Sequence, residues 1–400
     1  MPLPKVCVLC VIPELGGAEI SLMELVSRLR HCFEFHLIVP GKGPLQERAE
    51  QSGAKVWLLP WPHSIYRTGE SSAASAAVRL LCALPSVRSF TRQLETLLEE
   101  IGPSVLITNA VKAHIIGALA RRARHVPLVW YMRDGLEQRA ISRKLLALLS
   151  RRCNLAVCIS QYVAGQVRRY VSATLSVAVV YNIVDLNSFA PGIAAPPDLQ
   201  KHPGEIWFGT IGAITPLKGL DIFLDAAQSV SRHLPNARFV IVGMNPYATQ
   251  AGSDYEARLR HRVENSSLRD CVKFLGFRKD VANVLSRLDV LVQPNRGPEG
   301  LGRSVLEAMA CGVPVVAVNQ WGPAELIQSG ETGLLFPPLD SAALAAHMLT
   351  LGTDIPLRAN LGQRARVWIH QYLVPETLAR QFQAVLSGVI SPRRNEAMSA

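Results

Sequence analysis

The sequence predicts an α/β protein with two domains, each built around a doubly wound parallel sheet. The chain has 400 residues, more than the roughly 250 to 300 at which a single hydrophobic core stops growing, so two domains of similar size are expected. Short runs of β-branched residues alternate with amphipathic helical stretches along the whole chain. The runs are continuously apolar, which is typical of parallel strands that helices cover on both faces.

Apolar runs mark the expected strands in both halves of the chain. In the first half they are 5–12, 34–40, 55–60, 104–109, 127–132, 155–160 and 176–182, and in the second half 206–212, 237–243, 272–277, 290–294, 314–319 and 333–338. Amphipathic helices are expected between them, as at 219–234 and 341–352. Ligands of such sheets bind at the carboxyl ends of the strands, so the functional loops should follow the strands and line a cleft between the domains.

The domain limits follow from a change in composition. Residues 189–205 contain four prolines among small residues and predict a linker. We therefore expect an N-terminal domain at 1–190, a linker at 191–204 and a C-terminal domain at 205–374. The last stretch, 375–395, predicts an amphipathic helix.

Composition indicates the cellular location and the state of the cysteines. No apolar run reaches the roughly 18 residues of a spanning helix and the start lacks a signal-peptide pattern, so a cytoplasmic protein is expected. The eight cysteines lie mostly in apolar runs. Cys7 and Cys10 are three apart on an expected strand and should point to opposite faces, so we expect reduced core thiols and no metal site.

The net charge of +11 raises the question of an anionic partner. The basic and leucine-rich stretch 142–152 resembles an interfacial helix for an anionic membrane, which would make the protein peripheral on the inner face of the cell membrane. A solvated helix face over the sheet is an equal alternative. Nucleic acid is not expected, because no aromatic residues or known binding module accompany the charge.

Two glycine-containing loops follow the first expected strand of each domain. Gly16 and Gly17 open a helix, where backbone N–H groups and the helix dipole favour an anion, although an ordinary tight turn would look the same. In the second domain Gly212 follows the strand and Lys218 precedes the next helix, so a cation stands where a phosphate would be attracted. A surface lysine remains the alternative.

The stretch 294–314 combines a glycine-rich loop with two glutamates. We expect the loop at 295–302 to follow a strand, and a helix to run over 303–310 until Gly312 and Pro314 end it. Glu299 on the loop should face the cleft, and the N–H groups of Leu301, Gly302 and Arg303 should form a helix start aimed at an anion. Glu307 lies among apolar residues, which indicates burial with a partner, and it could accept hydrogen bonds from a diol such as a ribose.

These motifs together resemble those of the retaining GT-B glycosyltransferases of family 4. The resemblance rests on GGAE at 16–19, the loop from Gly212 to Gly219, VKFLGFRKDV at 272–281, and Glu299 followed by seven residues and Glu307. It covers nearly the whole chain, and the block at 291–340 is the most specific part.

The resemblance implies a fold, an activity and a set of site residues. It implies a GT-B fold in which the C-terminal helix 375–395 crosses back to an acceptor domain, while 205–374 binds the donor. The donor would be a UDP- or GDP-sugar, and the acceptor a hydroxyl of a lipid-linked saccharide or of a cell-envelope or extracellular polysaccharide, with retention of configuration and no cofactor. Catalytic roles fall on Glu299, Lys218 and Arg303, and donor binding on Gly16, Gly17, Gly212, Phe277, Arg278, Gly300, Leu301, Gly302 and Glu307.

Three positions depart from the family pattern. Ala213 stands where an arginine usually follows the glycine, and we expect Arg303 to supply the missing cation. Tyr131 replaces a frequent histidine after the fifth strand, which leaves His114, Tyr131, Arg133 and Asp134 as candidates on the acceptor side. Asn182 is followed by isoleucine in place of glycine, which changes a turn.

The chain has no Asp-x-Asp pair of the kind that holds a divalent ion on a diphosphate, so we expect metal-independent transfer. A catalytically silent GT-B-like subunit that binds nucleotide is one alternative. A sugar-nucleotide epimerase is another, and a dehydrogenase is the weakest, because no dinucleotide fingerprint follows either first strand.

Overall fold

The structure, a computed structural model, describes residues 2–62, 73–120, 122–245 and 250–391. The chain divides into two compact units. The first unit contains Met1–Ile183 and Glu376–Ala400, and the second contains Val184–Pro375. Residues 191–204, which we expected to form the linker, are therefore grouped with the second unit.

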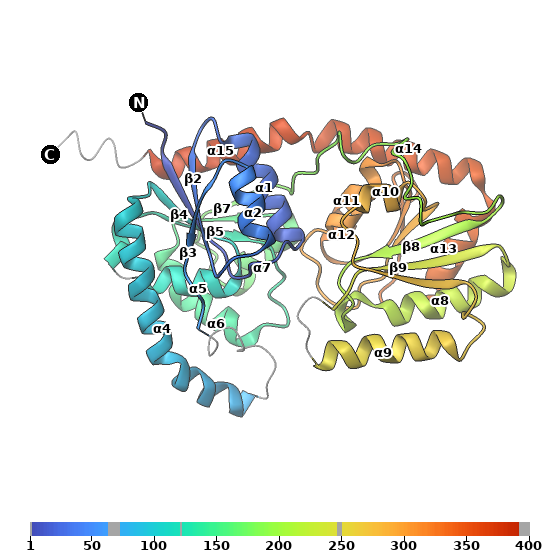
Figure 1. The fold of residues 1–400 in the computed structure, drawn as a ribbon, viewed down its shortest axis with the longest axis horizontal. Coiled ribbons are helices and arrows are strands. Elements are labelled where there is room, and N and C mark those ends of the chain that lie inside the picture. The colour runs from blue at the N-terminus through green and yellow to red at the C-terminus, as the bar shows by residue number, and fades with distance from the viewer. Residues whose placement is uncertain (1, 63–72, 121, 246–249, 392–400) are drawn as a thin grey trace. The chain divides into compact units, whose positions relative to one another are not determined.

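The first unit is a parallel sheet with helices on both faces (Figure 1). Within the described residues its strand order is β3-β2-β1-β4-β5-β6-β7. The strands are β1 (Lys5–Leu9), β2 (Glu34–Val39), β3 (Lys55–Leu58), β4 (Val105–Thr108), β5 (Leu128–Met132), β6 (Leu155–Cys158) and β7 (Val177–Val179). The helices are α1 (Gly17–Leu29), α2 (Pro44–Gln51), α4 (Ala73–Ile101), α5 (Val111–Leu119), α6 (Ala140–Leu149), α7 (Gln161–Tyr170) and α15 (Pro375–Ile390), with short 3-10 turns η1 (Arg122–His125) and η2 (Ser150–Arg152).

The second unit repeats this plan with strand order β10-β9-β8-β11-β12-β13 in its described part. Its strands are β8 (Ile206–Ile211), β9 (Ala237–Val242), β10 (Val272–Gly276), β11 (Val290–Gln293), β12 (Val315–Val318) and β13 (Leu334–Phe336). Its helices are α8 (Leu220–His233), α9 (Gln250–Glu264), α10 (Val281–Leu285), α11 (Arg303–Ala310), α12 (Trp321–Leu326), α13 (Ser341–Thr353) and α14 (Ile355–Tyr372), with the 3-10 turn η3 (Pro216–Lys218).

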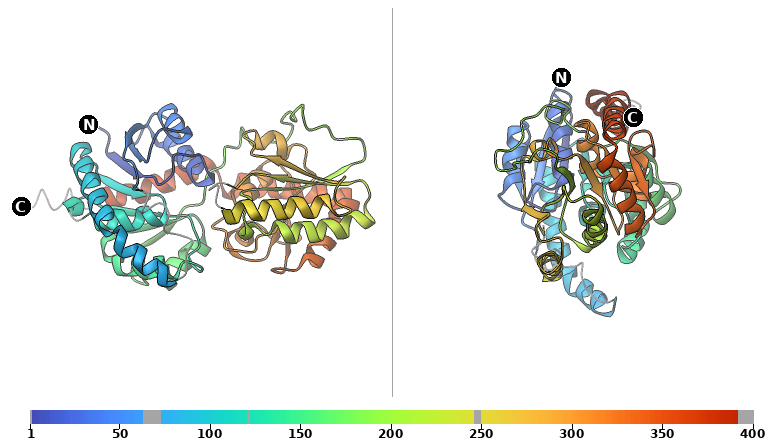
Figure 2. Two further views of the ribbon diagram at one scale, coloured as in Figure 1. Left: turned by 60° about the horizontal axis from the view of Figure 1, so that its bottom comes forward. Right: turned by 90° about the vertical axis from the view of Figure 1, so that its right-hand side faces the viewer.

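Helices cover both faces of the second sheet. Helices α8 and α9 run side by side along one face in both views (Figures 1 and 2), and the N–H of Asp221 donates to the hydroxyl of Tyr255 at 3.3 Å. Helix α11 covers the opposite face. The core between the sheet and α8 is filled by aromatic and aliphatic side chains, with the rings of Phe208 and Phe239 stacked 5.8 Å apart.

The predicted fold class is confirmed, and each expected apolar run contains a strand. The runs could be recognised because helices cover both faces of each sheet, so most strand positions are apolar. The last helix, α15, is grouped with the first unit. There the ring of Phe382 packs 5.3 Å from the ring of Tyr131 on β5.

The cysteines whose side chains are described are free thiols. Cys7 lies on β1, and Cys10 lies just beyond its end rather than on the strand. Burial raises the pKa of both thiols. Among the described helices, none combines the length and the apolar composition needed to cross a bilayer.

Candidate functional site

Two loops at the carboxyl edge of the second sheet are joined through their backbones. One loop follows β8 and contains η3, and the other follows β11. The carbonyl oxygen of Leu217 accepts hydrogen bonds from the N–H groups of Arg296 and Gly297, each at 3.0 Å. Because these are backbone contacts, the distance between the two loops is fixed independently of their side chains.

Glycine at position 219 makes this approach possible. Gly219 has φ +65°, in the left-handed region, and a Cβ there would lie 2.0 Å from the carbonyl oxygen of Pro294. No side chain fits in that space. The expected entry glycine of α8 is therefore needed both for its dihedral angle and for contact between the loops.

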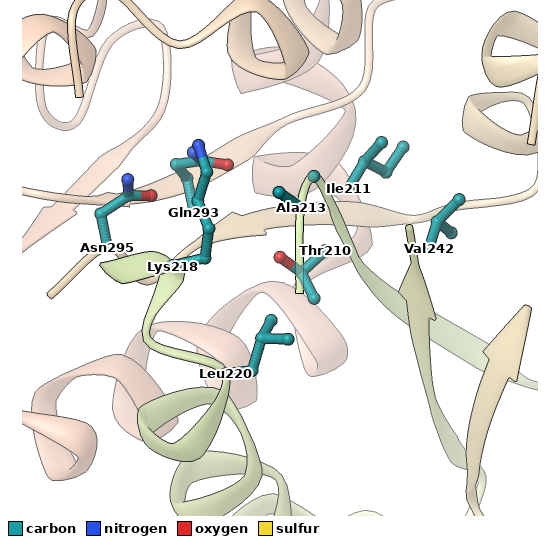
Figure 3. Close-up of a pocket in the computed structure, with 9 residues that line it drawn as sticks. Thr210, Ile211, Ala213, Lys218, Leu220, Val242, Gln293 and Asn295 are labelled. Carbon is teal, nitrogen blue, oxygen red and sulfur yellow. The ribbon is translucent and has the colours of Figure 1, made fainter. Parts of the chain in front are cut away.

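A small pocket lies beside this junction (Figure 3). Its lining comes from β8, the two loops, α8 and the ends of β9 and β11: Thr210, Ile211, Gly212, Ala213, Lys218, Leu220, Val242, Gln293 and Asn295. Lys218, Gln293 and Asn295 supply the polar tips that gather at one side of the picture. The pocket therefore offers one cation and two amides at the edge where ligands of parallel sheets bind.

The cation of this pocket contacts the first glutamate of the predicted site. The ammonium of Lys218 forms an ion pair and hydrogen bond with Oε2 of Glu299. Asn295 donates from Nδ2 to the same oxygen at 3.1 Å. The Lys218 side chain is 27% exposed and that of Glu299 is 19% exposed. A Cβ on Gly212 would lie 3.7 Å from Cε of Lys218, so the lysine stem passes beside this glycine.

The loop that carries Glu299 is also held from its other side. The N–H of Gly322 donates to the carbonyl oxygen of Glu299 at 3.0 Å. A Cβ on Gly322 would lie 2.3 Å from Cα of Leu301, so only glycine fits. Trp321 beside it has φ +60°, an unusual angle for a bulky residue. The start of α12 therefore fixes the backbone on which Glu299 lies.

Helix α11 begins and ends where the sequence predicts, at Arg303–Ala310. Gly302 precedes it with φ +93°, and no side chain caps its start. Glu307 is 6% exposed and its Oε1 accepts a hydrogen bond from Nε of Arg303 at 2.6 Å. Burial raises the pKa of the Glu307 carboxyl, and the charge of Arg303 opposes this rise. The partner that we expected for a buried Glu307 is thus the arginine one turn before it.

The residues predicted to frame the base follow β10. Phe277 is 53% exposed. Arg278 bonds to Asp198 (Nη1 to Oδ2, 2.5 Å) and to Asp280 (Nε to Oδ1, 2.8 Å), and these carboxylates raise the pKa of its guanidinium. Neither residue belongs to the lining of the described pocket. Arg278 thus ties residue 198 to the loop after β10.

The glycine pair of the first unit lies at the start of α1, with Gly16 preceding the helix. The carboxylate of Glu19 is turned back onto this helix start, where the N–H groups of Gly16 and Glu19 hydrogen-bond to it. Burial raises the pKa of the Glu19 carboxyl, while the charge of Arg133 and these N–H groups oppose the rise. A negative group of the chain itself therefore already occupies the position at which Gly16 and Gly17 were expected to attract an anion.

The four acceptor-side candidates lie in different surroundings. His114 is buried, its Nδ1 lies 2.6 Å from Oγ1 of Thr108, and burial lowers its pKa to about 3. Tyr131 is fully buried on β5. Asp134 is about half exposed and pairs with Arg139 at 3.3 Å. A direct contact of His114 or Tyr131 with an acceptor would require these side chains to become accessible.

Arg133 is the buried cation of this group. It is 8% exposed, its guanidinium lies 4.1 Å from the ring centroid of Tyr131, and its Nε donates to Oδ1 of Asn109 at 2.7 Å. Its Nη1 donates to Oδ1 of Asn182 at 3.3 Å. The turn at Asn182, singled out as a departure from the family pattern, thus helps to hold Arg133.

The structure adds residues that the sequence interpretation did not select. Gln293 and Asn295 line the pocket, Ser304 donates to Gln293 at 3.2 Å, and Glu19 occupies the start of α1. Gln293 and Asn295 are polar residues at the carboxyl end of an apolar strand, and that rule alone could have identified them. Residues 63–72 and Arg121 lie outside the described residues.

Comparison with known proteins identifies the family. The sequence model for "Glycosyltransferase Family 4" matches residues 15–188, and the model for "Glycosyl transferases group 1" matches residues 194–368. The chain belongs to glycosyltransferase family 4. One match lies mostly within each unit, so each unit carries its own family signature.

Named relatives agree with this assignment. The UDP-Gal:alpha-D-GlcNAc-diphosphoundecaprenol alpha-1,3-galactosyltransferase of Escherichia coli is 24% identical over 83% of this chain and 83% of its own length. The putative colanic acid biosynthesis glycosyltransferase WcaL of Escherichia coli K12 is 28% identical over 60% of this chain. The matched part spans 58% of the length of WcaL.

Solved structures agree with the fold. The crystal structure of HepE from Anabaena in complex with UDP and glucose has a TM-score of 0.80 to this chain, with 24% identity, and the match covers 96% of this chain and all of HepE. This family 4 chain therefore has the GT-B fold.

Proposed function

We propose that this family 4 chain is a retaining glycosyltransferase. It moves a hexose from a nucleotide-diphosphate sugar to a hydroxyl of a lipid-linked or cell-envelope or extracellular polysaccharide acceptor. The observation that carries the proposal is the Lys218 ammonium, which lines a pocket at the carboxyl edge of the second sheet and contacts Glu299 on the neighbouring loop. A cation and a carboxylate on two loops joined by backbone hydrogen bonds suit a ligand that carries both a diphosphate and a sugar.

In this proposal Lys218 binds the diphosphate of the donor. The relatives support a UDP-sugar: the Escherichia coli galactosyltransferase is named for UDP-Gal, and HepE was crystallised with UDP. A GDP-sugar is the second choice. Glu299 and the N–H groups of Gly300, Leu301 and Gly302 would hold the transferred sugar and the distal phosphate.

Glu307 is the proposed ligand of the ribose. Its burial and its bond to Arg303 hold the carboxylate in one orientation, which is what recognition of two neighbouring hydroxyls requires. Arg303 then orients Glu307 in addition to supplying positive charge near the start of α11. The proposed role of Phe277 and Arg278 is to frame the base. For Gly16 and Gly17 to approach the phosphates, the Glu19 carboxylate would have to leave the start of α1.

Stabilisation of the leaving diphosphate is assigned to Lys218, Arg303 and the N–H groups at the start of α11, because the sequence has no Asp-x-Asp pair. Transfer is then metal-independent. The bond between the anomeric carbon and the diphosphate oxygen breaks, and the acceptor oxygen bonds to that carbon on the same face, which gives retention. The leaving phosphate takes the proton of the acceptor hydroxyl. Asp134, which is about half exposed, is the proposed contact to the acceptor. A contact by Arg133 would require its buried guanidinium to become accessible.

The experiment is a thermal-shift panel with UDP, GDP, ADP and dTDP, followed by donor turnover with the matching nucleotide sugars. A ligand at about 100 times its dissociation constant stabilises by about 2.7 kcal/mol, which raises the melting temperature by several degrees. We expect UDP to give the largest shift, and release of UDP from a UDP-hexose to continue in EDTA. A shift without turnover of any donor in the presence of membrane-derived acceptors would favour a silent nucleotide-binding subunit. Loss of turnover in EDTA that magnesium or manganese restores would refute metal independence.

A further inference from the structure

The ammonium of Lys218 is paired with the Glu299 carboxylate. In the proposed function the donor diphosphate requires the same positive charge. Both side chains are more than two-thirds buried. Neither can turn into bulk water without losing this contact. A diphosphate beside Lys218 would place further negative charge close to the Glu299 carboxylate. Two anionic groups would then compete for one cation.

Glu299 has a second partner that carries no charge. Asn295 is 2% exposed and its Nδ2 donates to the same carboxylate oxygen that Lys218 contacts. The other end of its amide, Oδ1, is buried and has no hydrogen-bond partner among the described residues. The Asn295 amide is therefore positioned by its bond to Glu299, and the backbone bonds from Arg296 and Gly297 to Leu217 fix the loop beside it.

We propose that Lys218 exchanges Glu299 for the donor diphosphate, and that Asn295 is a positioning residue that holds the Glu299 carboxylate after the exchange. The inference rests on the proposed function, in which a diphosphate binds at Lys218. Glu299 competes with the diphosphate for Lys218, and its Oε2 becomes available to a sugar hydroxyl only once the diphosphate has taken the ammonium. Without Asn295 the carboxylate would be left in a largely buried place with neither partner.

A double-mutant cycle on UDP binding tests the exchange. Calorimetry would measure the dissociation constant of UDP for the full-length wild type, Glu299→Gln, Lys218→Met and the double variant. We expect Glu299→Gln to tighten UDP binding by roughly threefold to tenfold, because a partly exposed ion pair no longer has to be broken. In the Lys218→Met background the same substitution should change UDP binding by less than about twofold.

The cycle separates the exchange from its alternatives. A carboxylate that merely repels the diphosphate through space would weaken UDP equally with and without Lys218, and that result would overturn the exchange. Unchanged or weaker UDP binding by Glu299→Gln would also overturn it. If the wild type binds none of UDP, GDP, ADP and dTDP, the proposed function fails and the exchange fails with it. If the wild type binds but the cycle shows no coupling, only the exchange fails.

A second cycle tests Asn295. Asn295→Leu keeps the volume but has no donor, and we expect it to weaken UDP by about tenfold when residue 299 is glutamate and by much less when it is glutamine, because a charged acceptor loses more than a neutral one. Asn295→Ser, which retains a donor, should recover part of the affinity. Equal weakening in both backgrounds would indicate a merely structural role and would refute the positioning role.

The matched control is Asn236→Ala. The Asn236 amide donates to the carbonyl oxygen of Gly204 at 2.5 Å, next to the amino-terminal ends of β8 and β9. Its loss should leave the UDP dissociation constant unchanged. Melting temperatures of all variants establish that they are folded before binding is compared.

Discussion

The same position in the two sheets is used in opposite ways. In each unit a glycine-containing loop follows the first strand and leads into a helix. In the first unit the start of α1 is occupied by the carboxylate of Glu19, and the nearby cation, Arg133, is buried and bonded to two asparagines. In the second unit the cation, Lys218, is partly exposed and lines a pocket.

This difference shows that a glycine loop before a helix does not by itself define an anion site. At α1 the chain places its own carboxylate, that of Glu19, on the helix start. At η3 and α8 the chain supplies a cation that is paired with a carboxylate on a neighbouring loop. The Lys218–Glu299 pair of the second unit can exchange partners. In the first unit the Glu19 carboxylate stays on the start of α1.

The largest predicted effect that tests this comparison is on the stability of the first unit. Arg133→Met would leave Glu19 buried without its cation and the Oδ1 atoms of Asn109 and Asn182 without their donor. Removing one partner of a buried charged group costs about 3 to 5 kcal/mol, so urea denaturation should show a loss of that size. Arg262→Met, which removes a partly exposed pair with Asp225 and long hydrogen bonds to Gln228 and the Asp221 carbonyl, should cost less than about 1 kcal/mol. Similar losses for both variants would contradict the internal role of Arg133.

The opposite result is expected in the second unit. Lys218→Met should lower donor turnover by about 10² to 10³, the size seen when a group that stabilises developing negative charge is removed. The free energy of unfolding should change by less than about 1 kcal/mol, because the lost ion pair is partly exposed. Initial rates of nucleotide release and urea midpoints measure the two quantities on the same preparation. A large loss of stability with normal turnover would assign Lys218 to the fold instead.

The glycines of the two loops should also differ. Gly219→Ala should destabilise by about 2 to 4 kcal/mol, since the alanine must adopt a left-handed φ and displace the backbone of Pro294. Gly16→Ala has an ordinary φ of −88° and meets only the end of the flexible Glu19 side chain at 2.9 Å, so about 1 kcal/mol is expected. Chemical denaturation of the pair measures this difference. Equal costs would show that the contact between the second-unit loops is not what requires glycine.

These contrasts mark what the sequence alone could and could not predict. Helix α11 and every strand were predictable, because burial on both faces gives continuous apolar runs and Gly302, Gly312 and Pro314 delimit the helix. Pairing between loops was not. Lys218 and Glu299 are 81 residues apart, and Arg278 and Asp198 are 80 apart. Their contacts depend on how strand ends meet in space, which no local pattern encodes.

The burial of individual polar residues was the second feature that the sequence did not predict. The spacing of 16–19 gives no sign that Glu19 folds back onto the helix start, and the histidine and tyrosine proposed for the acceptor side turned out to be buried. A single polar side chain inside an apolar segment can face either the core or solvent, and the pattern of apolar residues along the sequence is the same in both cases. The roles of the individual site residues therefore remain predictions for mutagenesis.

The pH dependence of stability tests the burial of the Glu19 carboxyl in the first unit. Burial raises the pKa of Glu19 above its ordinary value near 4.5. Between that value and the raised one the native state holds more protons than the unfolded state, so the contribution of Glu19 to the free energy of unfolding falls as the pH rises. Glu19→Gln does not titrate at this position. The wild type should therefore lose stability relative to Glu19→Gln between pH 4.5 and 7, by about 1.4 kcal/mol for each unit of the pKa rise. Urea denaturation at several pH values gives this difference, and a difference that stays flat or grows in favour of the wild type would contradict the burial of Glu19.

The smallest expected effect concerns the outer surfaces of the two units. Helix α6 exposes Ile141 (50%) and Leu148 (76%), and Lys144 and Arg151 are exposed beside them. This pattern suits contact with an anionic membrane, one of the two alternatives that the sequence left open for this stretch. Each basic residue near such a surface contributes about 1 kcal/mol, so reversing both charges should weaken binding to anionic vesicles by about tenfold or more.

The matched control reverses two exposed arginines of the second unit, Arg258 and Arg260 on α9. Arg260 already pairs with Glu256 at 2.7 Å, and α9 lies beside α8 on the second unit (Figure 2). The net charge changes equally in the two double variants, so a long-range electrostatic effect would weaken both. Loss of vesicle sedimentation only for the α6 variant would place the membrane contact on the first unit. Equal losses, or no binding by the wild type to anionic vesicles, would instead make α6 a solvated helix face, whose exposed leucine and isoleucine need no partner.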